Sequence, residues 1–539
     1  MTVLLLFVLW AAAEQHQGHQ AADRPATLVA GLGNLNHPIA TKSREAQQFF
    51  NQGLTFVYAF NHDEAIRSFW RAAELDPASP MPHWGIALAL GPNINLDVDP
   101  EREKAAYDEA QKAKSMASSA PAGERAYIDA LVKRYSNDPK ADLKALAVQY
   151  KDAMREVTRQ YPNDLDAATL YAEALMDLHP WQLWSNDGKP AEGTEEIVAV
   201  LESVLKRDPM HIGANHYYIH AVEASKTPGR ALTSARRLDT LVPNAGHLVH
   251  MPAHIYMRTG DYHAAVASNA RAAEVDRKYI EAAKPGGVYP HMYYNHNLDF
   301  LASAAMMTGQ FAEASRAADQ LVAAATPAVA AMPMLEPFAA KKVYVLLRFA
   351  KWDEVLALPQ PDQKLTLLTA LSHFGRGVAH AARGRAGEAK REQSAYLEAR
   401  QKISGDMDWG YNKAARMLVV TDNVLAARIA EAEKQPAAAI EAWRRTVAAE
   451  DGLNYNEPAD WFYPTRESLG AALLRNANAA DAERVFREDL ERNPKNARSL
   501  FGLWQSLAAQ GRTVEAGRAE QEFKAAWERA DVDLKLSDF

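Results

Sequence analysis

Histidine is concentrated in one stretch of this 539-residue sequence, where nine of the 17 histidines lie between residues 211 and 296. The segment GHLVHMPAHIYMRTGDY, residues 246–262, places His247, His250 and His254 at positions i, i+3 and i+7, a spacing that brings side chains to one face of a helix. Pro252 interrupts this stripe, because proline lacks the N–H that a helix interior needs. The sequence predicts either a helix that begins near Pro252, with His247 and His250 on the preceding loop, or a helix that is kinked there.

The residue types in this region are those that bind transition metals. Neutral imidazole nitrogen and carboxylate oxygen suit zinc, copper, iron or manganese. Each ligating imidazole also needs an acceptor for its second nitrogen, and the Tyr, Asn and acidic residues between the histidines can supply one. The candidate ligands are numerous enough for two ions.

The composition disfavours several other kinds of chemistry. The chain has no Cys, so it has no disulfide, thiolate nucleophile, covalently attached c-type haem or ordinary iron–sulfur cluster. It also lacks a Ser-His-Asp spacing, a phosphate-binding glycine loop and an HExxH motif. The net charge of -8 and the lack of a sustained basic stripe argue against nucleic acid as a partner.

The elements that must position these histidines are predicted to be helices. Ala-rich segments with helical periodicity recur along the chain, and Gly and Pro fall mainly between them, which predicts an all-α fold. The chain is also repetitive, because the same separations of 12, 4 and 8 residues occur near both ends. They separate the residues of Gly53-Ala65-Phe69-Pro77 and of Gly470-Ala482-Phe486-Pro494.

This spacing resembles the tetratricopeptide repeat, a helical hairpin of about 34 residues that needs small residues where helices cross, an aromatic plug and a terminating proline. The resemblance runs from about residue 46 to 530, and the segments RTGDYHAA and MTGQFAEA place Gly260 and Gly309 at hairpin turns. It implies an α-solenoid, a tetratricopeptide-type helical-hairpin superhelix, over residues 46–539, with histidine-rich central repeats at 165–310.

The resemblance also implies which side chains face a common groove. In this family the second, fifth, ninth and twelfth positions of each repeat face the concave surface, and aligning the repeats on Ala231, Gly260 and Gly309 places imidazoles and carboxylates there. The predicted metal ligands are His216, His220, His250, His254 and His296. The second-rank ligands, or groups that hydrogen-bond to ligands, are His247, Glu223, Glu173 and Asp299.

Three segments depart from the repeat length, and each is rich in aromatic residues or proline. They are LGPNINLDVDP after residue 89, HPWQLWSNDGKPAEG at 179–193 and EDGLNYNEPADWFYPT at 450–465. Exposed Trp and Tyr in such number would leave apolar surface in water, so these loops are expected to fold over the array. They either pack the end of the superhelix or line a site.

The first residues, MTVLLLFVLWAAA, combine an apolar run with a small-residue cleavage pattern, which predicts a signal peptide at 1–13 and export to the periplasm or the medium. Residues 14–45 are expected to form a disordered lead-in. No later stretch is apolar and long enough to span a membrane. The strings GANHYYIHAVEAS, GHLVHMPAHIY and HNLDFL resemble those of exported bacterial tetratricopeptide proteins with histidine-rich central repeats.

These observations predict an exported protein that holds a mono- or dinuclear transition-metal site in its groove. Copper is the first choice, because a nitrogen-rich ligand set favours it over harder metals, and zinc and iron are alternatives. The protein would then be a metal-dependent oxidoreductase acting on a small molecule, or a metal-dependent hydrolase in which a nearby Glu is the base. The alternative from a different class is a metal-free scaffold that binds a peptide or partner protein in the groove. Self-association end to end is also compatible with such repeats.

Overall fold

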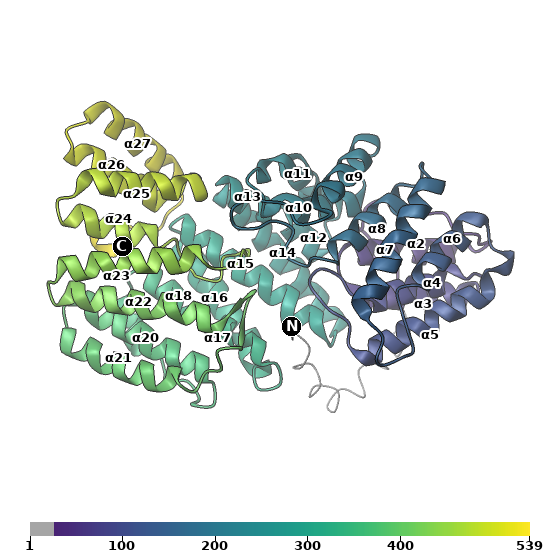
Figure 1. Ribbon diagram of the computed structural model, residues 1–539, viewed down its shortest axis with the longest axis horizontal. Coiled ribbons are helices and arrows are strands. Elements are labelled where there is room, and N and C mark those ends of the chain that lie inside the picture. The colour runs from purple at the N-terminus through teal and green to yellow at the C-terminus, as the bar shows by residue number, and fades with distance from the viewer. Residues whose placement is uncertain (1–25) are drawn as a thin grey trace. The chain divides into compact units, whose positions relative to one another are not determined.

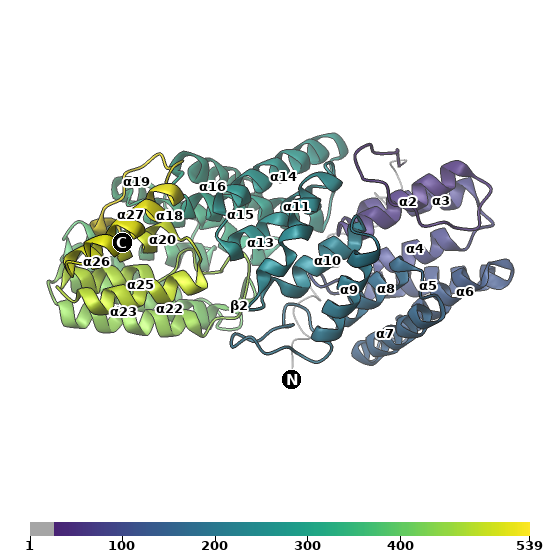
Figure 2. The same cartoon turned by 90° about the horizontal axis from the view of Figure 1, so that it is seen from above.

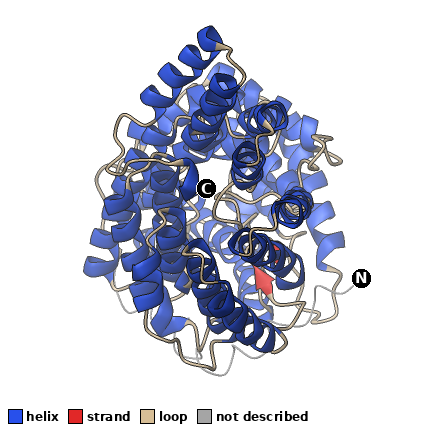
Figure 3. Cartoon of the chain, turned by 90° about the vertical axis from the view of Figure 1, so that its left-hand side faces the viewer, coloured by secondary structure: helices blue, strands red, loops and turns tan. Residues whose placement is uncertain are grey.

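The computed structural model describes residues 26–539, which fold almost entirely into helices (Figures 1 and 3). Within this range the strands are β1 (Asp408–Trp409) and β2 (Asn412–Lys413), a short antiparallel pair. The predicted all-α class is therefore confirmed. The predicted signal peptide and residues 14–25 of the expected lead-in lie outside the described residues. No helix in the described part is long and apolar enough to cross a membrane.

The described chain divides into two compact units. The first contains the residues up to Ile255 together with Glu274–Tyr289, and the second contains Tyr256–Ala273 and Pro290–Phe539. The helices of the first unit are α2 (Arg44–Tyr58), α3 (His62–Leu75), α4 (Met81–Leu90), α5 (Pro100–Met116), α6 (Ala122–Leu131), α7 (Leu143–Gln160), α8 (Leu165–Met176), α9 (Thr194–Arg207), α10 (Ile212–Glu223), α11 (Leu232–Leu241) and α12 (Gly246–His250).

Helices α13 (Pro252–Thr259) and α14 (Tyr262–Ala283) contribute residues to both units. The remaining helices belong to the second unit. They are α15 (Tyr294–Met307), α16 (Phe311–Ala325), α17 (Glu336–Ala339), α18 (Lys341–Arg348), α19 (Trp352–Ala357), α20 (Thr366–Ala382), α21 (Ala386–Arg400), α22 (Ala414–Ala432), α23 (Pro436–Asp451), α24 (Arg466–Arg475), α25 (Ala479–Arg492), α26 (Ala497–Ala509) and α27 (Thr513–Ala526).

In the first unit an aromatic plug holds adjacent hairpins together. The fully buried ring of Phe69 on α3 lies between Gly53 on α2 and Gly85 on α4. A Cβ at either glycine would lie 2.6 Å from a ring atom of Phe69, so only glycine allows the helices to approach this closely. Helices α8, α9 and α10 continue the stack side by side (Figure 2). This packing is that of the predicted tetratricopeptide-type hairpin.

The second unit repeats the arrangement, with the pairs α20/α21, α22/α23 and α24/α25 lying side by side (Figure 1). Phe486 packs between Gly470 and Gly502, where added Cβ atoms would lie 2.6 and 2.1 Å from its ring. Gly260 and Gly309 have φ values of 76° and 74° at the turns before α14 and α16, as the sequence predicts for hairpin turns. The tetratricopeptide-type fold is therefore present in both units.

Residues 26–43 are bound to the repeats, so the expectation of a disordered lead-in is wrong for residues 26–45. The backbone N–H of Val29 donates to the Gln52 side chain on α2 at 2.8 Å, and the carbonyl of Gly31 accepts from the N–H of Asn244 at 3.1 Å. The buried His37 side chain is 2.8 Å from a carboxylate oxygen of Asp166 on α8. Hydrogen bonds to the repeats therefore fix the conformation of this segment, which forms no helix or strand of its own.

The aromatic segment at 450–465 packs into the second unit. Trp461 is 2% exposed and belongs to the same hydrophobic core as Tyr463. The side chain of Asn412 on β2 donates to the carbonyl of Asn454 at 3.2 Å and to the Asp460 carboxylate at 2.8 Å, which fastens the segment to the hairpin. The segment thus packs the second unit, and its residues Phe462 and Tyr463 also line a cavity there.

Candidate metal centre

Five imidazoles of the first unit form a closed cluster in which each side chain contacts two others. The distances between consecutive ring centroids are 4.9, 4.9, 5.7, 4.7 and 5.4 Å. All five residues are buried, with exposures between 0% and 5%. This five-histidine cluster consists, in order of contact, of His220, His216, His247, His250 and His254, with His254 returning to His220.

Three short helical segments carry the cluster. His216 and His220 lie one turn apart on α10 and therefore share a face. His247 and His250 lie on α12, which ends at His250, and a new helix, α13, begins at Pro252 and carries His254. Proline is well suited to the first turn of a helix, where its missing N–H leaves no bond unmade. The prediction of a helix start at Pro252 is confirmed, although the preceding histidines lie on a short helix and not on a loop.

Hydrogen bonds fix the protonation of three of these rings. Nδ1 of His216 lies 2.6 Å from the carbonyl oxygen of Tyr58, which can only accept, so Nδ1 carries the proton. Nδ1 of His220 and Nδ1 of His254 each lie 2.6 Å from a different oxygen of Glu223. In a neutral imidazole the other nitrogen then carries a lone pair. Three Nε2 atoms thus carry a lone pair that can accept a hydrogen bond or bind a metal ion.

The Glu223 carboxylate is ionised in this arrangement. Burial works against its charge, but the imidazoles of His254 and His220 outweigh burial and hold the pKa of Glu223 below its ordinary value. A buried carboxylate that accepts from two imidazoles orients both rings, as the outer partners of metal-bound histidines do. The structure therefore places Glu223 in the orienting role that the sequence left open for it.

The Nε2 atoms of the cluster approach one another in pairs. Nε2 of His247 is 3.1 Å from Nε2 of His216, and Nε2 of His250 is 2.8 Å from Nε2 of His254. Two nitrogen lone pairs repel at such distances, so a proton or a cation must lie between each pair. Two nitrogens bound to one tetrahedral ion at about 2.0–2.1 Å would be separated by about 3.3 Å, close to these values.

Burial favours the neutral form of two imidazoles of the cluster. Burial lowers the pKa of His216 well below its ordinary value, and the neighbouring His220 adds to the effect. Burial likewise lowers the pKa of His220. Neutral imidazole is the metal-binding form, so these two side chains need not release a charge-bearing proton before they can coordinate an ion at neutral pH.

Groups of ligand atoms in the cluster are close enough to hold an ion. Donor atoms of His216, His220 and His247 all lie within 4.8 Å of one another, and so do those of His220, Glu223 and His254. Five imidazoles with one carboxylate suit copper, zinc or iron, and the donor set fits the predicted metals.

Aromatic side chains surround the imidazoles. The ring of Phe60, at a φ of 54° in the turn between α2 and α3, lies 4.6 Å from that of His216 and 5.4 Å from that of His247. Trp181, also in the left-handed region at a φ of 58°, meets His220 edge-on at 5.6 Å and donates to Asn95 at 3.0 Å. The loop at 179–193 therefore lines the site through Trp181, and the loop after residue 89 holds Trp181 in place through Asn95.

Three further predicted ligands have contacts of their own, and two of them belong to the second unit. Glu173 on α8 is buried beside Arg134, whose Nη1 is 3.9 Å from its Oε2. Asp299 lies on α15 in the second unit, where it forms an ion pair of 2.6 Å with Lys341. His296 is on the same helix and its ring packs edge-on against Phe300 at 5.4 Å. Metal binding by these residues stays a prediction.

Comparisons with known proteins show no relative that defines a family. No protein-family model matches the chain, and no curated protein sequence matches it. Among solved structures, the APC/C hetero-tetramer Cut9-Hcn1 is 12% identical over 90% of this chain and 76% of that chain, with a TM-score of 0.33. Human IFIT1 with PPP-AAAA is 12% identical over 90% and 91%, with a TM-score of 0.33. Yeast Tom70 is 11% identical over 89% and 93%, with a TM-score of 0.28. Scores this low support no conclusion about function, and the fold assignment rests on the helix packing described above.

Proposed function

We propose that the first unit binds transition-metal ions in the five-histidine cluster. Nε2 of His216, His220 and His247 would hold one ion, and the pair His250 and His254 would supply ligands to a second. The observation that carries this proposal is the orientation of the rings: three Nδ1 atoms donate to a carbonyl or to Glu223, so that the corresponding Nε2 lone pairs face the interior of the cluster.

Copper is the metal that we favour, and one-electron oxidation–reduction is the chemistry that it would supply when bound. The donors are mainly imidazole nitrogens, and Phe60 and Trp181 cover them with apolar surface that limits the access of water. A small-molecule substrate remains the proposed reaction partner. In this proposal the chain contributes ligand orientation, burial and an aromatic enclosure.

Hydrolysis that uses Glu223 as the general base fits the site less well. Both of its oxygens accept hydrogen bonds from imidazoles, and its pKa is held below the ordinary value, which makes it a weak base at neutral pH. The oxidoreductase reading is therefore the better of the two enzymatic proposals. Export to the periplasm or the medium, predicted from residues 1–13, remains part of the proposal.

The test is the metal content of the protein purified without an affinity tag. Inductively coupled plasma mass spectrometry should find one to two equivalents of copper, or zinc where copper is withheld, and electron paramagnetic resonance should show Cu(II) in a nitrogen environment. The double variant His250→Ala/His254→Ala should lose at least one equivalent with nearly unchanged helical circular dichroism. His373→Ala is the matched control, because that imidazole pairs singly with Glu392 at 2.7 Å in the second unit.

Metal at the same stoichiometry in the double variant and in the unaltered chain would overturn the ligand assignment. Metal absent from every preparation, and not taken up from added Cu(II) or Zn(II), would overturn the metal proposal. The remaining function would then be that of a scaffold for a peptide or partner protein.

A further inference from the structure

Three arginines of the second unit converge on one cavity. Arg348 on α18, Arg428 on α22 and Arg498 on α26 line it, and its volume is about 20 Å³. Each of these helices is the first of its hairpin, being followed by α19, α23 and α27 respectively. The apolar part of the lining includes Trp352 and Phe374. The cavity thus combines cationic and aromatic surface, unlike the imidazole cluster of the first unit.

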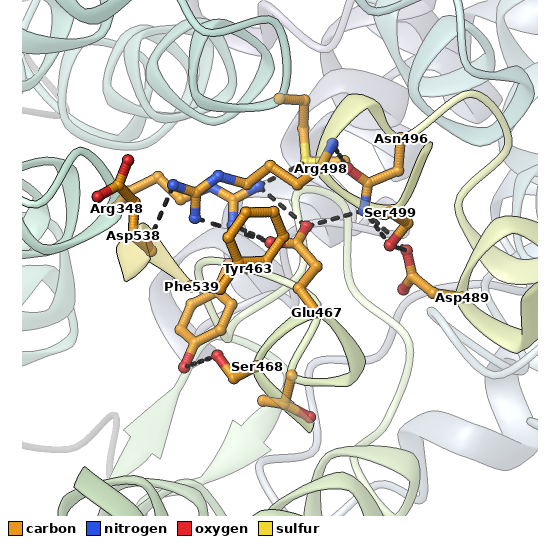
Figure 4. A network of polar contacts seen from close by, with 12 residues as sticks. Arg348, Tyr463, Glu467, Ser468, Asp489, Asn496, Arg498, Ser499, Asp538 and Phe539 are labelled. Carbon is orange, nitrogen blue, oxygen red and sulfur yellow. Dashed lines mark hydrogen bonds and ion pairs between the residues drawn. The ribbon is translucent and has the colours of Figure 1, made fainter. Parts of the chain in front are cut away.

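The carboxylates near these arginines are shared among several guanidinium groups. Glu467 binds both Nη atoms of Arg348 and also lies 3.9 Å from Nη1 of Arg498 (Figure 4). Burial and the positive charge of Arg348 together lower the pKa of Arg498 to about 9. Within the described residues, Nε of Arg348 and Nε of Arg428 are buried and have no hydrogen-bond partner. The site therefore has donor capacity and positive charge to offer a ligand.

The segment at residues 536–539 lies in this site. Nη1 of Arg428 donates to the backbone oxygen of Phe539 at 2.5 Å, and Nη2 of Arg498 donates to that of Asp538 at 3.2 Å (Figure 4 draws the second contact). The Arg498 guanidinium also lies 4.9 Å above the centre of the Phe539 ring, a cation–π contact. The ring of Phe501 stacks on Phe539 at 5.9 Å.

Phe539 is the buried anchor of this segment, to which partly buried Leu536 and a hydrogen bond of 3.0 Å from Arg475 to the Leu536 carbonyl add further attachment. Phe539 is 1% exposed, whereas every other residue between 520 and 539 is partly or fully exposed. The segment is bound by the ends of long arginine side chains and by ring stacking, not by helix or strand pairing. A segment held by one buried ring, partly buried side chains and side-chain hydrogen bonds can be exchanged for another that offers the same groups.

We propose that the arginine-lined cavity is a binding site for peptide segments in which an acidic residue precedes an aromatic residue, and that residues 536–539 occupy it in cis. The aromatic ring fills the apolar part of the cavity and receives Arg498 on its face. The backbone oxygens accept from Arg428 and Arg498, and the negative charge of Asp538 favours the charged form of Arg498. A partner that carries such a segment binds only when the resident segment leaves.

Competition between a labelled peptide and the resident segment tests this proposal. The probe is fluorescein-DVDLKLSDF, which has the sequence of residues 531–539, and binding to the full chain is followed by fluorescence anisotropy. A tethered segment has an effective concentration of about 1 mM, so the unaltered chain should bind the probe negligibly up to about 100 μM. The Phe539→Ala chain should bind it at least 10-fold more tightly than the unaltered chain.

Two controls assign the binding to this site. A probe that ends in Ala in place of Phe should not bind the Phe539→Ala chain. Adding Arg498→Ala to that chain should lower its affinity for the intact probe at least 10-fold. Arg445→Ala, which changes an arginine with a 53% exposed side chain on α23, should leave binding unchanged.

Three results would overturn the proposal. One is a folded Phe539→Ala chain, as judged by circular dichroism, that does not bind the probe. Another is equal binding by the unaltered and Phe539→Ala chains, which would place the probe at a different site. The third is unfolding of the Phe539→Ala chain, because a segment that the fold requires is a permanent cap and not an exchangeable occupant.

Discussion

The substitution Glu223→Gln tests the orientation of the imidazoles directly. In the structure, both oxygens of Glu223 accept, one from Nδ1–H of His220 and one from Nδ1–H of His254. An amide keeps one acceptor oxygen and replaces the other with an NH₂ donor. One of the two imidazoles would then face a donor, and moving its proton to Nε2 is the change that relieves the conflict. That ring would lose the lone pair that it directs into the cluster.

The expected magnitude follows from the role of such partners in metal sites. Loss of a group that orients a metal-bound histidine lowers metal affinity by about 10–100-fold, which corresponds to about 1.4–2.7 kcal/mol. Affinity for Cu(II) and Zn(II) can be measured by competition with a chromophoric chelator. At saturating metal, the stabilisation of the folded state should fall by the same amount, because it depends on the logarithm of the dissociation constant.

The matched control is Glu202→Gln. Glu202 is also a hydrogen-bonded carboxylate of the first unit, accepting from the hydroxyl of Tyr218 at 2.5 Å and from Arg230 at 2.7 Å, but it touches none of the five histidines among its described contacts. Its variant should bind metal like the unaltered chain. Equal affinity of the Glu223→Gln and Glu202→Gln chains, within twofold, would refute the claim that Glu223 fixes the orientation of the rings.

Three further predictions concern the scaffold. A Cβ at Gly246 would lie 1.9 Å from a carboxylate oxygen of Asp276, so Gly246→Ala should displace α12 and lower both the melting temperature and the metal content, whereas Gly123→Ala, with 3.8 Å to its nearest neighbour, should change neither. Phe486→Ala should destabilise the second unit by about 3–5 kcal/mol in denaturant unfolding, because it empties the space between two helices. Burial raises the pKa of Glu450 to about 7. The protonated side chain therefore contributes stability that is fully present below pH 4 and is lost as the pH rises through about 7. The melting temperature should fall less between pH 5 and pH 7.5 in the Glu450→Gln chain than in the unaltered chain.

The repeat architecture could be predicted from local spacing because the contacts that define it are local. Phe69 on α3 contacts Gly53 on the preceding helix α2 and Gly85 on the following helix α4. The same residue separations therefore recur wherever a hairpin packs on the next. The lead-in at 26–43 was mispredicted for the opposite reason, since its partners Gln52, Asp166 and Asn244 are spread over more than 190 residues.

The candidate site was predicted in part, and the omissions have a common cause. The spacing along α10, α12 and α13 identified the five imidazoles, because each helix presents its own side chains at a fixed period. The carbonyl of Tyr58 and the ring of Phe60 reach the cluster only because α2 packs against α10, more than 150 residues later in the chain. A left-handed φ at Phe60 also has no signature in the sequence, since glycine or asparagine is the usual residue there.

The two units bury different polar groups on the same kind of scaffold. Its stability comes from apolar plugs such as Phe69 and Phe486, which leave other positions of the first helices free to vary. Those positions carry imidazoles on α10 and arginines on α18, α22 and α26. Burial of these side chains is costly unless each lone pair or charge has a hydrogen-bond or ionic partner. Packing alone would favour apolar residues at these positions. In the five-histidine cluster, nitrogen atoms of neighbouring rings approach within 2.8 Å, and this burial becomes favourable when a shared proton or, as we propose, a bound cation lies between them.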